Sequence, residues 1–272
     1  MKEIIAVDFG GTNLRVALVR ENKIIKLIEG KTPKSKSKLL KDLVDYIEKL
    51  INKNVVGIGV SSPGPLKEGR ILNSPNIPLK NFYLESFLKK KFKIKVLVEN
   101  DANCVALAES KLGVKKDNFF VLTLGTGIGG GVVINGDVYN LRDIGAELGY
   151  IFIENGKTLE DLAGFKKVSM ETKKAFGREI YVSELIKMKD KKSKKIIEDL
   201  SENVSKGIGS LINIFNPAVV VLTGGMTHSG DKLLSLIRKK SKKYILLPKK
   251  YDIRYSRLKE PGIIGASLLI KY

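Results

Sequence analysis

The first twenty residues, MKEIIAVDFGGTNLRVALVR (residues 1–20), decide the fold that the sequence predicts. Two apolar runs, Ile4–Val7 and Leu14–Val19, are typical of buried strands. Between them, Asp8–Asn13 contains two glycines and an asparagine, a composition that favours a tight turn between paired strands. The stretch therefore predicts a hairpin whose turn carries polar groups.

The polar groups of this turn suit a bound anion. Gly10 and Gly11 have no Cβ, so a bound group can approach their backbone closely. Their N–H groups, with the Thr12 hydroxyl and the Asn13 amide, could form a nest of donors. Asp8 could help to hold a Mg²⁺ ion that accompanies the anion. The alternative is a structural hairpin in which Asp8 only caps the turn.

The composition predicts a soluble chain of about two domains. Its 272 residues exceed one typical domain, and its net charge is +20. A nucleic-acid surface is one interpretation of this charge. The chain lacks a Cys/His finger and an RNP-type aromatic run, so we favour solvated lysine-rich faces and thermophilic adaptation. Lysine is densest in four tracts: Lys34–Lys41, Lys89–Lys95, Lys187–Lys195 and Lys239–Lys250.

Targeting signals are not evident in the sequence. It has no run of about 18 apolar residues and no signal peptide, so we expect no membrane association and a cytoplasmic location. The single cysteine, Cys104, excludes an internal disulfide.

The elements that follow extend the opening hairpin. The pattern predicts a third strand at Ile24–Glu29, a helix at Lys38–Ile51 and a buried strand at Val55–Val60. This element order is that of a ribonuclease-H-like half-domain. Two turn-rich loops come next, at Ser61–Leu66 and Asn73–Pro78. Polar loops at the ends of core elements often form ligand sites, although simple connectors are the alternative.

A carboxylate follows the next strand. The strand is predicted at Ile94–Val98 and the helix after it at Ala102–Lys111. Asp101 lies between them and could cap the helix. It could equally be a carboxylate at the mouth of a cleft, where a general base is needed. The residue types alone leave both interpretations open.

A second glycine-rich turn echoes the first. The apolar strand Asn118–Leu124 is followed by Gly125–Gly131, which contains a G-x-G-x-x-G pattern. A dinucleotide-binding fold requires a helix at that place. Here the β-branched run Val132–Ile134 and the turn Asn135-Gly136 predict a second hairpin instead. Two such hairpins indicate an internal duplication.

The last part of the chain predicts a third glycine turn. Thr223–Met226 follows a buried strand at Ala218–Leu222 and precedes a helix near Asp231–Lys239, a suitable place for a nucleotide base or ribose. A long helix is predicted at Ile196–Phe215 and a short amphipathic helix at Gly262–Ile270.

Seven motifs in this order resemble the ROK family of sugar kinases and related repressors, within the actin-like ATPase superfamily. The resemblance runs almost end to end. The motifs are DFGGTNLR (Asp8–Arg15), SSPGPL (Ser61–Leu66), NSPNIP (Asn73–Pro78), ENDANC (Glu99–Cys104), LGTGIGGG (Leu124–Gly131), GAELGY (Gly145–Tyr150) and LTGGM (Leu222–Met226).

The resemblance implies an α/β fold with two ribonuclease-H-like domains around a central cleft for nucleotide and sugar. We expect residues 1–100 plus 256–272 to form the first domain and residues 101–255 the second. It also implies MgATP and a sugar as ligands, and a homodimer.

The resemblance also implies roles for individual residues. Asp101 would be the general base and Asp8 would contact Mg²⁺ through water. The expected sugar-binding residues are Gly64, Asn76, Asn100, Asp101, Glu147, Tyr150 and Glu160. The expected nucleotide-binding residues are Asp8, Gly10, Gly11, Thr12, Asn13, Gly125, Thr126, Gly127, Gly129, Gly224 and Gly225.

Two departures from the family's pattern concern a structural zinc. The usual E-x-G-H motif here ends in Tyr150, and the cysteine-rich segment that follows it is reduced to residues 154–160 without cysteine. With Cys104 and His228 alone in the chain, we predict no zinc. The acidic pair Glu160-Asp161 could contact sugar or could complement a helix dipole.

These features predict an ATP-dependent hexose kinase, most simply one that phosphorylates the 6-hydroxyl of glucose. N-acetylmannosamine, N-acetylglucosamine and fructose are alternative substrates. A non-catalytic sugar-sensing protein or transcriptional regulator of the same family is the competing class. We expect the repressor form to need a DNA-binding module ahead of the first strand, which begins at about residue 3.

Overall fold

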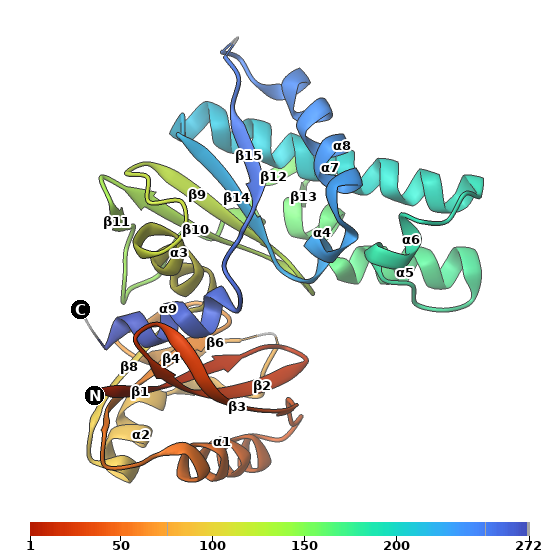
Figure 1. Cartoon of the computed structure of the whole chain (residues 1–272). Helices are drawn as coiled ribbons and strands as arrows, with labels where there is room; N and C mark the ends of the chain where they lie inside the picture. The colour runs from red at the N-terminus through yellow and green to blue at the C-terminus, as the bar shows by residue number, and fades with distance from the viewer. Residues whose placement is uncertain (75, 248, 271–272) are drawn as a thin grey trace. The chain divides into compact units, whose positions relative to one another are not determined.

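The computed structural model describes residues 1–74, 76–247 and 249–270. Pro75 of the predicted Asn73–Pro78 loop lies outside them. The chain forms two compact units (Figure 1). The first comprises Met1–Lys115, Asp137–Ala146 and Leu258–Tyr272, and the second comprises Lys116–Gly136 and Glu147–Arg257.

The opening hairpin forms the centre of the first unit's sheet. The first strand pairs antiparallel with the second and parallel with the fourth, which confirms the predicted hairpin. Val7 and Val16 are fully buried partners across it. The strand order is β3-β2-β1-β4-β8, with β1 at Glu3–Phe9, β2 at Asn13–Arg20, β3 at Lys23–Lys31, β4 at Val55–Ser62 and β8 at Lys95–Asn100.

Helices cover both faces of this sheet. Helix α1 (Lys36–Leu50) buries Leu39, Leu43 and Ile47, which recur at helical spacing. It lies with α2 (Leu84–Phe92) on one face, and α9 lies on the opposite face (Figure 1).

Helix α9 (Pro261–Leu269) differs from its prediction. The sequence predicted an amphipathic helix, but residues 263–269 are all buried. The reason is close packing on two sides. A Cβ on Gly59 of β4 would lie 1.8 Å from the Ala266 carbonyl oxygen, and a Cβ on Gly265 would lie 1.8 Å from that of Cys104. Glycine on β4 and glycine on α9 therefore let the helix fit between the sheet and α3 (Asp101–Lys111).

The second five-stranded sheet repeats the strand order of the first. It runs β11-β10-β9-β14-β15, which is again third, second, first, fourth and fifth in chain order. The central strand β9 is antiparallel to β10 and parallel to β14, as β1 is to β2 and β4. The predicted internal duplication is confirmed at this level. The strands are β9 (Phe119–Leu124), β10 (Ile128–Ile134), β11 (Asp137–Val138), β14 (Val219–Thr223) and β15 (Asp252–Tyr255).

The limits of the two units differ from the predicted domains. Residues 101–115 and 137–146 group with the first unit and residues 256–257 with the second, whereas the sequence predicted the opposite assignment for each. The cause is the close packing of α3 on α9, because α9 also packs on β1 and β4.

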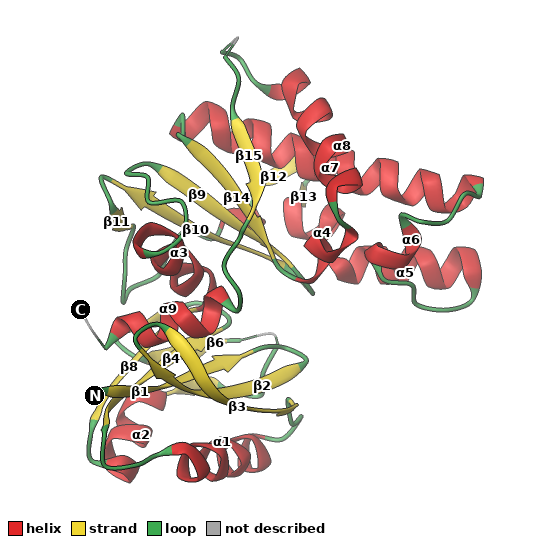
Figure 2. Cartoon of the chain, in the orientation of Figure 1, coloured by secondary structure: helices red, strands yellow, loops and turns green. Residues whose placement is uncertain are grey.

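The remaining elements are shorter sheets and the helices of the second unit (Figure 2). Sequence periodicity did not predict the small sheets. They are β5 (Leu66–Lys67), β6 (Arg70–Asn73) and β7 (Lys80–Phe82), and the pair β12 (Phe152–Glu154) and β13 (Lys157–Thr158). The helices are α4 (Leu159–Ala163), α5 (Phe165–Phe176), α6 (Val182–Leu185), α7 (Lys191–Phe215), α8 (Asp231–Ser241) and the 3₁₀ turns η1 (Leu148–Tyr150), η2 (Gly225–Ser229) and η3 (Lys242–Tyr244).

Candidate active site

The carboxyl ends of three parallel strands meet at one edge of the first unit's sheet. Asp8 at the end of β1 is opposite Ser61 of β4, and Ser62 of β4 is opposite Asn100 of β8. The Ser61 hydroxyl donates to Asp8 Oδ1 at 3.0 Å, and Asn100 Nδ2 donates to the Gly64 carbonyl at 3.3 Å. The register therefore brings Asp8, Gly64 and Asn100 to one edge, where such folds commonly hold ligands.

Asp8 carries a charge that its surroundings disfavour. Burial raises the pKa of its carboxyl group above the ordinary 3.8, while the Ser61 hydroxyl and the Arg15 guanidinium oppose the rise. An ideal Cβ on Gly262, near the start of α9, would lie 3.2 Å from Asp8 Oδ1. Carboxylate oxygen is the ligand that Mg²⁺ prefers, so Asp8 fits the predicted metal contact chemically.

The first glycine turn is closed largely by backbone hydrogen bonds. Gly10 N donates to the Asn13 carbonyl at 2.9 Å, and the Thr32 hydroxyl donates to the Gly10 carbonyl at 2.6 Å. A Cβ on Gly10 would lie 2.8 Å from the Asn13 carbonyl oxygen, so the turn requires glycine there. Gly11 lies beside the Asn76 side chain, with 3.2 Å between its ideal Cβ position and Asn76 Cβ.

One predicted donor of this turn is directed elsewhere. Asn13 Nδ2 donates to Glu29 Oε1 of β3 at 2.5 Å. The Thr12 carbonyl accepts from Thr32 N at 2.9 Å, which ties the turn to the end of β3. The Asn13 side-chain amide therefore bonds to Glu29 of β3 and does not point into the turn as a donor for an anion.

Helix α3 begins at Asp101, but its N-cap is Asn100. Asn100 Oδ1 accepts from Ala102 N at 2.9 Å and from Asn103 N at 3.2 Å. The interpretation of Asp101 as the N-cap is therefore wrong. Asp101 is the first helical residue, and its Oδ1 also accepts from Ala102 N at 2.8 Å. The helix N-terminus favours a negative charge at this position.

Sequence reasoning missed the buried carboxylate next to this cap. Glu99 accepts hydrogen bonds from Asn100 N at 2.7 Å, from Asn103 Nδ2 at 3.1 Å and from Arg142 N. Burial raises the pKa of Glu99, although these donors oppose the rise. Arg142 also pairs with buried Glu85 at 3.2 Å. The sequence did carry a signal for this residue, because a glutamate in an otherwise apolar strand indicates a buried carboxylate with hydrogen-bond partners.

The second glycine turn is shorter than the sequence suggested. Gly125 N donates to the Gly127 carbonyl at 3.0 Å, so the turn spans residues 125–127. Gly129 lies in β10, where its N–H donates to the Thr123 hydroxyl at 3.0 Å. The nearest described atom to an ideal Cβ on Gly125 is 3.9 Å away, which leaves open space beside that residue.

The third glycine turn adjoins the second. It follows β14, which is parallel to β9, so the two strands end at the same edge of the second sheet. Gly224 has a φ of +95°, and a Cβ there would lie 2.6 Å from the Leu124 carbonyl oxygen. No described atom lies within 4 Å of an ideal Cβ on Gly225. Gly125 and Gly225 therefore both leave room for a bound group.

Three predicted sugar contacts gather in the second unit. Burial and the charge of Glu160 raise the pKa of Glu147. Burial, then the charges of Glu160 and Glu147, raise the pKa of Tyr150. Glu160 Oε2 accepts from Ile128 N at 2.7 Å, at the start of β10. Glu160 is thus close enough to Glu147 and Tyr150 to influence both, and its hydrogen bond places it at the second glycine turn.

The two neighbouring acids, Glu160 and Asp161, make different contacts. Asp161 completes a capping box with Thr158 at the start of α4, so the helix-terminus interpretation holds for Asp161. Glu160 instead directs its carboxylate to β10.

The residues present do not fit a zinc site. Residues 150–160 contain neither cysteine nor histidine, and Glu154, a potential ligand there, forms an ion pair with Lys206. Within residues 1–74, 76–247 and 249–270, no group of three or more His, Cys, Asp or Glu side chains could hold a metal ion. In the same residues, no helix is long and apolar enough to cross a membrane.

Comparisons with known proteins find similar sequences over almost the whole chain. A model of the ROK family matches residues 4–272. The glucokinase of Thermotoga maritima is 32% identical, over 99% of this chain and 97% of its own length. The xylose repressor of Caldicellulosiruptor bescii is 26% identical, over 96% of this chain and 76% of its own length.

The fold is likewise found among solved structures. A ROK family glucokinase from Streptomyces griseus, crystallised in complex with glucose and AMPPNP, superimposes with a TM-score of 0.88. The match covers 98% of each chain at 22% identity, so it establishes the fold. The two sheets with the same strand order are thus those of an actin-like ATPase fold.

Proposed function

The chain belongs to the ROK family, and on that premise we propose that it is an ATP-dependent kinase of a hexose hydroxyl, most simply the 6-hydroxyl of glucose. One observation carries the proposal. Asp101 lies at the strand edge that also holds Asp8 and the first glycine turn, and Asn100, not Asp101, caps the helix. A carboxylate at this edge, in the first turn of a helix, has the chemistry that a general base requires.

The proposed chemistry is an in-line phosphoryl transfer. The Asp101 carboxylate accepts the proton of the sugar hydroxyl as that oxygen bonds to the γ-phosphorus of ATP. The bond from the γ-phosphorus to the β-phosphate oxygen breaks, and ADP leaves. The glycine turns at residues 10–12 and 125–127 would bind phosphate oxygens with backbone N–H groups. Asp8 would hold Mg²⁺ through water, and the ion neutralises phosphate charge when bound.

The proposed sugar contacts supply both donors and acceptors. Asn76, Asn100, Glu147 and Glu160 would bond to the hydroxyl groups of the sugar. A pocket of this kind discriminates among epimers because a wrong epimer leaves buried polar groups unpaired. Tyr150 stands where the family usually has histidine, so N-acetylmannosamine, N-acetylglucosamine and fructose are the alternative substrates.

A sugar-sensing regulator is the competing proposal, because a xylose repressor is among the relatives. The two proposals differ in turnover. A kinase releases ADP only when its sugar is present, whereas a sensor binds sugar without consuming ATP. We further propose a cytoplasmic homodimer, which gel filtration with light scattering would test.

The deciding experiment measures ADP release from MgATP with a panel of hexoses and N-acetylhexosamines at elevated temperature. The variant Asp101→Asn should lose about 100- to 10,000-fold in kcat while keeping its unfolding temperature and ATP binding. Asp45→Asn on α1 is the control and should match the wild type. Wild-type turnover in Asp101→Asn would overturn the assignment of the base. ATP and sugar binding without turnover would favour the regulator.

A further inference from the structure

Contacts with the second glycine turn hold the Glu160 carboxylate in place. Its carboxylate fills the space beside the second glycine turn, since a Cβ on Gly127 would lie 2.1 Å from Glu160 Oε2. The same oxygen accepts from Ile128 N at 2.7 Å. Glu160 is in the first turn of α4, so whatever orients α4 also orients Glu160.

A two-residue hairpin leads into α4. Strands β12 and β13 pair Glu154 with Lys157, and only Asn155 and Gly156 lie between them. Both have positive φ, 49° and 70°, as a type I′ turn requires. Immediately after the hairpin, Leu159 N donates to the Ile151 carbonyl at 2.9 Å, which ties the start of α4 to the strand before the turn.

A capping box then fixes the first turn of α4. Thr158 Oγ1 accepts from Asp161 N at 3.1 Å, and Asp161 Oδ2 accepts from Thr158 N at 3.0 Å. The two bonds satisfy N–H groups that the helix itself leaves unpaired. The bonds that Thr158 N and Thr158 Oγ1 donate to Asp161 Oδ2 hold the pKa of this carboxyl group below its ordinary value. Because Glu160 lies between these two residues, its direction follows from the box.

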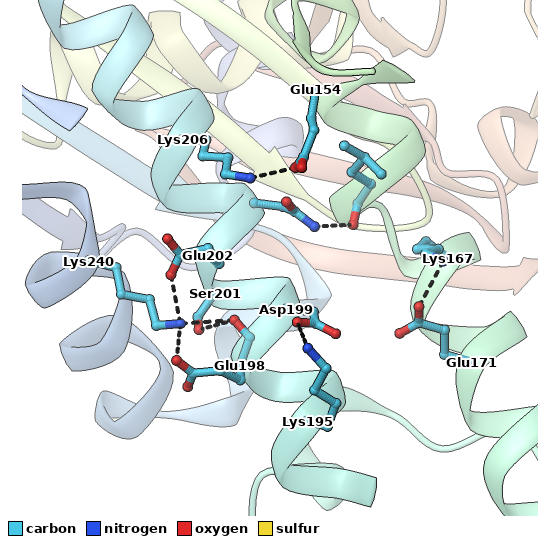
Figure 3. Close-up of polar contacts among 12 residues, drawn as sticks. Glu154, Lys167, Glu171, Lys195, Glu198, Asp199, Ser201, Glu202, Lys206 and Lys240 are labelled. Carbon is cyan, nitrogen blue, oxygen red and sulfur yellow. Dashed lines mark hydrogen bonds and ion pairs between the residues drawn. The ribbon is translucent and has the colours of Figure 1, made fainter. Parts of the chain in front are cut away.

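The long helix α7 contacts both the hairpin and α4, and Figure 3 shows its contact between Lys206 and Glu154. Lys206 pairs with Glu154 at 2.5 Å, and Asn203 Nδ2 donates to the Leu162 carbonyl at 3.3 Å. A Cβ on Gly207 would lie 2.6 Å from Leu159 Cδ2, so the glycine lets α4 approach α7 closely. The β12–β13 hairpin and helix α4 thus both pack on α7.

We propose that residues 152–161 form a metal-independent brace that positions Glu160. The brace consists of the Asn155-Gly156 turn, the Thr158–Asp161 capping box and the Glu154–Lys206 ion pair. Thr158 and Asp161 are positioning residues, and residues 152–161 contain neither cysteine nor histidine. The inference about sugar rests on the proposed function, whereas the inference about Glu160 and metal does not.

A metal assay gives the first test. The purified protein should contain well under one zinc per chain by elemental analysis, and a zinc-selective chelator in excess Mg²⁺ should leave its unfolding temperature unchanged. Stoichiometric zinc together with a lower unfolding temperature after chelation would overturn the proposal.

A matched pair of glycine variants gives the second test. Gly156 and Gly177 both have positive φ, +70° and +72°, and no described atom lies within 4 Å of an ideal Cβ at either. Gly156→Ala and Gly177→Ala therefore impose the same backbone strain. Gly177 ends α5 and takes no part in the brace. Only Gly156→Ala should speed hydrogen exchange at the Ile128 amide, which Glu160 protects. Equal exchange in the two variants would overturn the brace.

Sugar affinity separates the brace from a general loss of stability. Gly156→Ala and Thr158→Ala should raise the sugar KM about 10- to 100-fold and leave the ATP KM unchanged, while Gly177→Ala should change neither. Thr158→Ser keeps the hydroxyl and should restore the wild-type KM. An unchanged sugar KM in Thr158→Ala would overturn its positioning role. If no sugar is turned over, the exchange and zinc tests still decide the brace, so failure of the proposed function is distinguishable.

Discussion

The two glycine turns occupy equivalent places in two sheets of the same strand order, yet they are held differently. The turn after β1 is closed by its own backbone and by Thr32 from the end of β3. The turn after β9 is contacted by side chains and helices that come later in the chain. Its Gly125 carbonyl accepts from Phe165 N at 3.1 Å, and Glu160 packs on Gly127.

The difference teaches that strand order fixes where such a turn lies but not what supports it. The first turn is a local structure beside a buried carboxylate, Asp8. The second is joined through Glu160 to the proposed sugar-binding segment. A change at the first edge should therefore act mainly on chemistry, and a change at the second should act on stability and sugar binding together.

The largest expected effect concerns Asp8 at the first edge. Asp8→Asn should lower kcat about 10- to 100-fold, because the proposed contact to Mg²⁺ is lost. It should keep or raise the unfolding temperature near neutral pH, since a charge that burial disfavours is removed. Steady-state kinetics and calorimetry at pH 7 measure both. A marked loss of stability would contradict this view of the first edge.

The same variant has a pH signature. Folding raises the pKa of Asp8, so its contribution to stability is full below the unfolded value of 3.8 and is lost as pH rises through the folded value. The unfolding temperature of Asp8→Asn should exceed that of the wild type most above that pH range and least at acid pH. A difference that does not vary with pH would show that burial of the charge is not the cause.

The second prediction compares two glycines of the second turn. Gly127→Ala should lower the free energy of unfolding by roughly 1–3 kcal/mol, because its Cβ would overlap Glu160. Gly125→Ala has room for a methyl group and should change stability by no more than about 0.5 kcal/mol. If phosphate binds there, Gly125→Ala raises the KM for ATP. Denaturant unfolding and kinetics check both, and equal stability losses would remove the distinction.

The smallest expected effect tests the helices that support the second unit. Tyr244 donates to Glu202. Buried Lys240 pairs with Glu198 and Glu202 (Figure 3). The bond to Glu202 raises the pKa of Tyr244 from 10.0 to about 12. Its stabilising contribution is therefore full below pH 10 and is lost as pH rises through 12.

The variant Tyr244→Phe isolates this contribution. Between pH 10 and 12 the unfolding temperature should fall more steeply in the wild type than in Tyr244→Phe, and exposed Tyr83→Phe serves as the control. Parallel pH profiles for wild type and Tyr244→Phe would show that the hydrogen bond contributes nothing to the second unit.

Local patterns predicted the central strands of both sheets, five of the helices (α1, α3, α7, α8 and α9) and the places of the three glycine turns. They did not predict β15, α2, α4, α5 or α6. They failed where a distant segment decides the environment. Helix α9 was expected to be amphipathic because its neighbours on two sides are far away in sequence. Glycines 129–131 were assigned to a turn because a glycine-rich strand has the composition of a turn. In the structure they lie in β10, where Gly130 packs against Leu148.

By itself, the sequence determined the two glycine hairpins, the strands that flank them and the acidic and amide residues at strand ends, because turn chemistry and strand periodicity are local properties. Tertiary structure alone decided that Asn100 is the cap beside Asp101, that Glu99 holds the backbone around it, and that Glu160 rests on the second turn. Each of these depends on which hydrogen-bond donors come within reach after folding, and residues 32 positions apart, such as Ile128 and Glu160, carry no local pattern that reveals their contact.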